Sequence, residues 1–173
     1  MSKVYKFQEY QESTATKGRP DNYPTPEENN QLFFIQRNQS HNAVVYNVNL
    51  TLDGFINLNN PIEIYWLKFD DNEEKTPLNA IQRGIAYGYN FEVITNDLIK
   101  FSFVSYKKDF FLTKVNDRYC VITKFEDENC ILESFYVHAD QFGAFPVINY
   151  VEAHVCDARN MQKKVIRMDI GNC

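Results

Sequence analysis

Short apolar runs alternate with polar turns along this chain from Leu32 onward. Within residues 62–69, Ile62, Ile64 and Trp66 fall on every second position. A period of two places such side chains on one face of a β-strand. The pattern therefore predicts β-strands joined by compact turns.

We expect about ten strands, formed in the order of the chain. Their predicted ranges are 32–37, 43–50, 62–69, 87–95, 98–107, 110–115, 118–124, 130–138, 147–155 and 163–170. Strands that follow one another through short turns pair as an antiparallel meander. A meander of this size curls into a β-barrel or splits into a two-sheet β-sandwich, because long flat sheets leave edges that aggregate. The predicted fold class is all-β.

One segment breaks the β pattern. Thr76 suits the N-cap of a helix and Pro77 its first position, and apolar residues then follow at helical spacing. We predict one short helix near residues 77–86, ended by Gly84 or Gly88.

The N-terminal part differs from the rest in composition. Residues 11–31 are polar, hold three prolines and have almost no aliphatic side chains. Such a segment buries too little apolar surface to offset the entropy lost on ordering. We therefore predict a partly flexible arm over residues 1–31, with Val4, Tyr5 and Phe7 docking as a short strand, and a single β domain over residues 32–173.

Composition excludes several classes of protein. With 173 residues, 44% of them hydrophobic and 15% aromatic, the chain can bury a sizeable core and is not globally disordered. A net charge of −5 argues against a nucleic-acid-binding protein, which needs a concentrated basic surface. No apolar run approaches the ~18 residues that a membrane span needs. The first ten residues lack the apolar core of a signal peptide, so we expect a cytoplasmic protein.

No motif indicates a catalytic, metal or cofactor site. The cysteines are Cys120, Cys130, Cys156 and Cys173, and the histidines are His41, His138 and His154. Their spacing fits no zinc site. Cys120 and Cys130 could face each other across a hairpin, although two reduced core thiols are the more common arrangement without secretion. A pair of His154 with Glu152 is conceivable as base and carboxylate, but solvated strand histidines are more common.

A binding site is predicted where the strands end. In a meander, alternate turns meet at one end of the sheet, which here gathers Arg37, Arg83 and Lys107. Arg37 and Lys107 also continue apolar faces at period two, which could place cations at the mouth of an apolar cavity, with Trp66 and Tyr87 as walls. Alternatively, these basic side chains only cover apolar edges while their charges stay in water.

Three functions remain open from the sequence. The first is a non-enzymatic module that binds a small, partly apolar anionic ligand or a protein partner. The second is a hydrolase or isomerase that uses Arg83 or Lys107 with His41 or a carboxylate. The third is an interaction module with a filled core. An enzyme needs an acid or base beside a cleft, whereas a binding module needs only a cavity.

An ordered series of short motifs resembles one known family. The motifs are NYPTP at 22–26, LFFIQR at 32–37, NAVVY at 42–46, PIEIYW at 61–66, IQR at 81–83, AYG at 86–88 and FSFVSYK at 101–107. Together they resemble the uncharacterised bacterial domain-of-unknown-function family 4833, over approximately residues 22–168. The resemblance implies a small single-domain protein with no assigned activity and supplies no catalytic residues. Family members often carry an export signal, whereas the N-terminus of this chain shows none.

Overall fold

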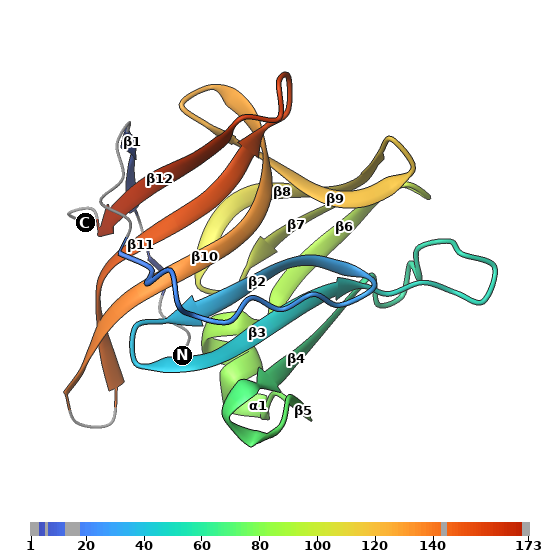
Figure 1. Cartoon of the computed structure of the whole chain (residues 1–173). Helices are drawn as coiled ribbons and strands as arrows, with labels where there is room; N and C mark the ends of the chain where they lie inside the picture. Colours follow the sequence, from blue (N-terminus) through green and yellow to red (C-terminus); the bar gives the residue numbers. More distant parts are fainter. Residues whose placement is uncertain (1–3, 6, 13–17, 143–144, 171–173) are drawn as a thin grey trace.

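The strands form one mixed β-sheet that curls into a half-barrel (Figure 1). The computed structural model describes residues 4–5, 7–12, 18–142 and 145–170. The described residues hold twelve strands: β1 (Phe7–Glu12), β2 (Gln31–Arg37), β3 (Ser40–Val48), β4 (Ile62–Lys68), β5 (Glu74–Pro77), β6 (Tyr89–Thr95), β7 (Leu98–Phe103), β8 (Tyr106–Val115), β9 (Arg118–Phe125), β10 (Glu128–Phe142), β11 (Phe145–Asp157) and β12 (Lys163–Ile170).

Strand β10 links two meanders. One runs β2-β3-β4-β5 and the other runs β6 through β12, with every neighbouring pair antiparallel. On one edge, β10 pairs antiparallel with β9 through its first residues and parallel with β2 through Ser134–Val137. Its other edge pairs with β11, and β12 and β1 follow. The long β10 therefore joins both meanders into one sheet.

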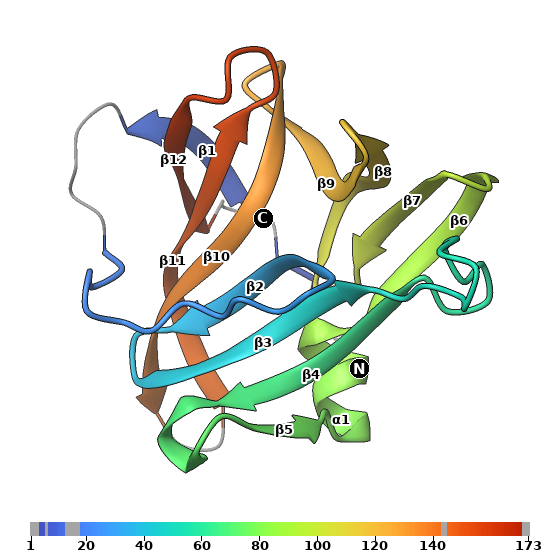
Figure 2. The ribbon, with the colours of Figure 1, turned by 45° about the vertical axis from the view of Figure 1, so that its right-hand side comes forward.

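A short helical segment connects the meanders and lies beside the curled sheet in both ribbon views (Figure 2). It consists of α1 (Ala80–Gln82) and the π-helical turn η2 (Arg83–Tyr87). Asn79 is the N-cap: its side chain accepts a hydrogen bond from the Gln82 backbone, and the Gln82 side chain accepts one from the Asn79 backbone. Gly88 ends the segment.

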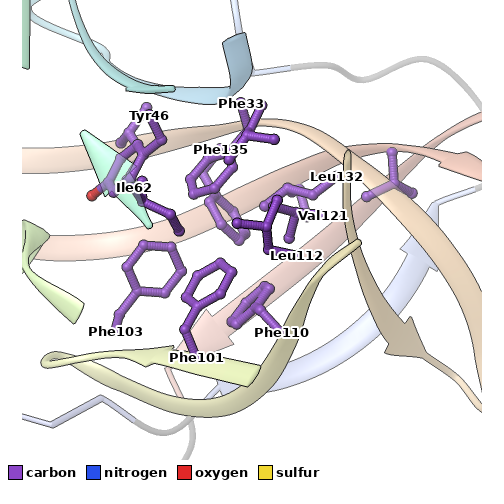
Figure 3. Packing of buried hydrophobic residues seen from close by; sticks show 14 of the residues in the cluster. Phe33, Tyr46, Ile62, Phe101, Phe103, Phe110, Leu112, Val121, Leu132 and Phe135 are labelled. Carbon is purple, nitrogen blue, oxygen red and sulfur yellow. The ribbon is translucent and has the colours of Figure 1, made fainter. Parts of the chain in front are cut away.

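The concave side of the sheet holds an aromatic core. Strand β7 shows the alternation clearly, because Ile99, Phe101 and Phe103 are buried while the residues between them are half-buried. Rings from several strands meet there: Phe33 stacks on Tyr46 with centroids 4.3 Å apart, and Phe101 stacks on Phe110 at 5.4 Å (Figure 3). This core fills one part of the half-barrel.

A second apolar cluster lies on the outer face of β2, β3 and β4. The segment 18–28 runs across it: the Arg19 guanidinium lies 5.8 Å from the Phe34 ring centroid, and the Tyr65 hydroxyl donates a 2.8 Å hydrogen bond to Glu28. Parts of the predicted N-terminal arm fall outside the described residues, and its separation from the β domain stays a prediction.

The all-β class and the short helix are confirmed, with changes at their boundaries. The N-cap is Asn79, whereas Thr76 and Pro77 belong to β5, where they pair with Trp66 and Tyr65. The residues between β4 and the helical segment form the 3₁₀ turn η1 (Phe69–Asp71) and then β5. The sheet is mixed, because β2 and β10 run parallel.

The predicted strand 98–107 is divided in two. A tight turn at Val104-Ser105 separates β7 from β8, and Phe103 pairs with Tyr106 across it. The prediction placed this turn at Lys108-Asp109 instead. The apolar run FSFV conceals the turn, because no glycine, proline or asparagine marks it.

Candidate functional site

An apolar cavity of about 660 Å³ lies on the concave side of the sheet, beside the aromatic core. We call it the apolar cavity. Its walls come from both meanders, from the helical segment and from the N-terminal strand. Representative lining residues are Arg37, Trp66, Ile85, Tyr87, Tyr106 and Met168.

Strand alternation turns Arg37 toward this cavity. Arg37 follows Phe33 and Ile35 at period two on β2, and both of those side chains belong to the inner core. Arg37 is half-buried and pairs with Val137 of the parallel strand β10. Among the described residues, no carboxylate forms an ion pair with Arg37. It is the single cation in the described lining of the apolar cavity.

Trp66 and Tyr87 stand next to Arg37. Their rings meet edge to face, with centroids 5.7 Å apart. Burial raises the pKa of the Tyr87 hydroxyl, while the charge of Arg37 and its hydrogen bond to that hydroxyl act in the opposite direction. The structure therefore brings three of the five sequence-predicted site residues together at one wall of the cavity.

Arg83 lies outside the lining. It is exposed in η2, and its charge acts on the buried hydroxyls of Tyr46 and Tyr89 rather than on the cavity. Tyr46 donates a 2.7 Å hydrogen bond to the Tyr87 carbonyl oxygen, and this contact anchors the end of η2. Arg83 therefore does not join Arg37 at the cavity wall.

Lys107 also lies outside the lining, because the turn at Val104-Ser105 resets the alternation. Tyr106 and Phe110 face inward on β8, so Lys107 between them is exposed on the outer face.

Several cavity walls were not predicted from the sequence. Phe7 and Tyr106 meet edge to face with centroids 5.0 Å apart, and the Tyr106 hydroxyl lies 3.8 Å from the Met168 sulfur. The backbone N–H of Tyr5 donates a 2.8 Å hydrogen bond to the Ser105 carbonyl oxygen. These contacts join residues from the start, middle and end of the chain, and no local sequence pattern predicts them.

The histidines lie apart from the apolar cavity. His41 is exposed, and its Nδ1 atom lies 3.7 Å from an Asp70 carboxylate oxygen. His154 does approach Glu152, with 3.3 Å between Nε2 and Oε1, but on the opposite face of β11 from the core residues Val151 and Ala153. Neither pair faces the cavity.

The remaining candidates for chemistry are the described cysteines and any cluster of side chains that could bind a metal ion. Cys120, Cys130 and Cys156 are free thiols, and Cys173 lies outside the described residues. Burial raises the pKa of the Cys156 thiol to about 11, and its hydrogen bond to Glu133 adds to the shift.

Within the described ranges, no group of three or more His, Cys, Asp or Glu side chains is placed to hold a metal ion. Nor do those ranges contain a helix with the length and apolar character needed to cross a bilayer.

Comparison with known proteins places the chain in a family without an assigned activity. A family model described as a domain of unknown function, DUF4833, matches residues 33–167. The match covers both meanders and most of the residues around the apolar cavity. Neither the curated proteins nor the solved structures contain a match to this chain.

Proposed function

The chain belongs to the family of the domain of unknown function DUF4833, and from that premise we propose that it is a binding module for a small ligand with an apolar body and an anionic head. The observation that carries this proposal is a single half-buried arginine, without a carboxylate partner among the described residues, in the wall of a mostly apolar cavity.

The size of the cavity supports a small-molecule ligand. Its volume of about 660 Å³ falls within the roughly 300–1,000 Å³ that is usual for ligand pockets. Its walls are rich in aromatic and aliphatic side chains. Each buried methylene group of a ligand contributes about 0.8 kcal/mol, so an alkyl chain supplies most of the binding free energy. A cavity of this size among the side chains also favours ligand binding over an interaction module with a filled core.

The chemistry of Arg37 supports an anionic head. A guanidinium group presents several N–H donors in a planar fork that matches a carboxylate or phosphate. The Arg37 guanidinium lies close enough to the Tyr87 hydroxyl to oppose the rise in its pKa that burial causes, so Tyr87 is placed to orient the guanidinium at the cavity wall. Orientation by Tyr87 reduces the entropy that Arg37 loses when an anion binds.

The cavity favours binding over catalysis. A hydrolase or isomerase needs an acid or base within hydrogen-bond reach of its substrate. The described lining has no carboxylate, imidazole or thiol side chain, and the hydroxyl of Ser105 donates its hydrogen bond to the Ala86 carbonyl oxygen at 2.8 Å. His41 with its partner Asp70 lies outside the cavity.

Trp66 provides a direct test, because it is the only tryptophan of the chain and lines the cavity. We expect decanoate to change Trp66 fluorescence in a saturable manner and decanol to bind more weakly. Arg37→Met should weaken decanoate binding about tenfold or more, since a charge-assisted hydrogen bond contributes about 1.5–3 kcal/mol. The binding of decanol should change little.

Lys124→Met is the matched control, because Lys124 is an exposed cation on β9 that lines no part of the cavity. It should leave both affinities unchanged. Thermal denaturation of Arg37→Met checks that the variant stays folded. The proposal fails if neither amphiphile gives a saturable signal, or if Arg37→Met and Lys124→Met weaken decanoate binding equally.

A further inference from the structure

A second, polar hollow adjoins the apolar cavity. Its volume is about 600 Å³, and it shares three lining residues with the cavity: Arg37, Trp66 and Gln82. The Trp66 indole nitrogen donates a 3.3 Å hydrogen bond to the Gln82 side-chain oxygen. Trp66 and Gln82 therefore line both the apolar cavity and the polar hollow. A ligand that fills the cavity with its polar end at this shared wall has that end beside the hollow.

Four of the five amide side chains that line the polar hollow leave their NH₂ donors free; the fifth, Gln39, donates a 3.4 Å hydrogen bond to the Ala139 carbonyl oxygen. The side-chain oxygen of Asn38 accepts a hydrogen bond from the Ala139 backbone at 3.0 Å, and that of Asn42 accepts one from the Asp70 backbone at 3.4 Å. The oxygens of Asn79 and Gln82 are occupied in the same way by the helix cap. Within the described chain, the NH₂ groups of these four amides have no hydrogen-bond acceptor. The hollow therefore presents donors without matching acceptors.

Two cations reinforce this polarity. Lys68 and Arg37 both line the polar hollow, and its described lining has no carboxylate side chain. Lys68 continues the inner face of β4 after Ile64 and Trp66. Glu74 pairs with Lys68 across the β4–β5 ladder, but it is exposed and forms no ion pair with Lys68. A group rich in negatively charged oxygens satisfies such a surface.

We propose that the polar hollow is a subsite for the phosphate head group of a single-chain amphiphile whose tail occupies the apolar cavity. This inference rests on the proposed function of the cavity. A phosphate monoester offers three terminal oxygens and up to two charges, whereas a carboxylate offers two oxygens and one charge. Phosphate thus engages Arg37, Lys68 and the free amide donors together, which a carboxylate is too small to do.

The experiment compares decyl phosphate, decanoate and inorganic phosphate by isothermal titration calorimetry on the full chain. We expect decyl phosphate to bind about tenfold tighter than decanoate, because an added charge-assisted hydrogen bond has that effect on affinity. Lys68→Met should remove most of this preference: decyl phosphate binding weakens about tenfold and decanoate binding changes less than about twofold. Arg37→Met should weaken both.

Lys124→Met again serves as the control and should alter neither affinity. Equal affinities for decyl phosphate and decanoate, or an equal effect of Lys68→Met on both, would overturn the head-group subsite while decanoate binding still supports the cavity. Inorganic phosphate binding as tightly as decyl phosphate would overturn the amphiphile in favour of free phosphate. Absence of binding by both amphiphiles would overturn the proposed function itself.

Discussion

Glu152 is a buried carboxylate that holds the N-terminal segment against the sheet. It is only 1% exposed, and its oxygens accept hydrogen bonds from the backbone N–H groups of Gly18 and Arg19 at 2.6 and 3.2 Å. His154 contacts the same carboxylate at 3.3 Å. Arg19 then donates a 2.9 Å hydrogen bond to the side chain of Gln36, which is fully buried. A chain of polar contacts thus fixes the segment to strands β11 and β2.

These contacts make the stability of the protein depend on pH. Burial would raise the pKa of Glu152, but the hydrogen bonds from His154, Gly18 and Arg19 outweigh it and lower the pKa below its ordinary value of 4.5. A lowered folded-state pKa contributes stability above the unfolded-state value, and that stability is lost as the pH falls through the folded-state pKa.

We therefore predict that Glu152→Gln lowers the free energy of unfolding by about 1–2 kcal/mol near neutral pH, because a charged acceptor is replaced by a neutral one. The difference from the wild type should shrink as the pH falls from 4.5 through the lower folded-state pKa of Glu152, because below that pKa both side chains are neutral. Urea denaturation at neutral and acidic pH measures this. Glu63→Gln, at an exposed position of β4, is the control, and a Glu152→Gln effect independent of pH would contradict the prediction.

At the scale of elements, the helical segment positions one wall of the cavity. The π-helical turn η2 is wider than an α-helical turn, a feature that is frequent at functional sites. It ends where the backbone N–H of Gly88 donates a 3.0 Å hydrogen bond to the Arg83 carbonyl oxygen. A β-carbon at Gly88 would lie 2.1 Å from that same oxygen. The end of η2, and with it Tyr87, therefore depends on glycine at this position.

Two alanine substitutions in this segment should have different effects on the free energy of unfolding. Gly88→Ala should lower the free energy of unfolding by about 1–3 kcal/mol, because backbone must shift to admit the methyl group. Gly84→Ala meets no atom within 4 Å and should be neutral or stabilising by up to about 1 kcal/mol, because alanine loses less entropy than glycine in a helix. Urea denaturation of both variants measures the contrast. Equal effects would show that the close approach at Gly88 does not constrain the segment.

At the scale of the whole molecule, β10 pairs with strands of both meanders, so we expect the meanders to unfold as one cooperative unit. Phe135 lies on β10 and pairs with Ile35 of the parallel strand β2. Its ring lies 6.4 Å from that of Phe33 in the smaller meander and 6.0 Å from that of Phe103 in the larger one. Removing it leaves a cavity between both parts of the core.

Phe135→Ala should lower the free energy of unfolding by about 3–5 kcal/mol, as expected for a large core aromatic. Unfolding should remain a single transition, so far-UV circular dichroism and Trp66 fluorescence should give the same midpoint in urea. Phe55→Ala is the control, because Phe55 is 63% exposed and its loss should cost within about 0.5 kcal/mol. Separate midpoints for the two probes would show that the meanders unfold independently.

The candidate site shows which inferences depend on local pattern. Arg37 and Trp66 were assigned to the inner face by alternation within single strands, and both side chains do line the apolar cavity. Lys107 was assigned by the same rule, but the rule fails there because an apolar turn interrupts the strand. Alternation is reliable only as far as the strand boundary is known, since one displaced turn reverses every side chain that follows.

The sequence by itself determined the all-β class, most of the strand ranges and the inward residues of strands such as β2 and β4, because these depend on interactions between near neighbours in the chain. Only the tertiary structure decided the parallel pairing of β2 with β10 and the joining of Phe7, Tyr106 and Met168 in one wall. It also decided that two cations and four free amide donors share a hollow. Those contacts link residues far apart in sequence, and their partners are selected by packing of the whole sheet, for which no short stretch of residues carries a signal.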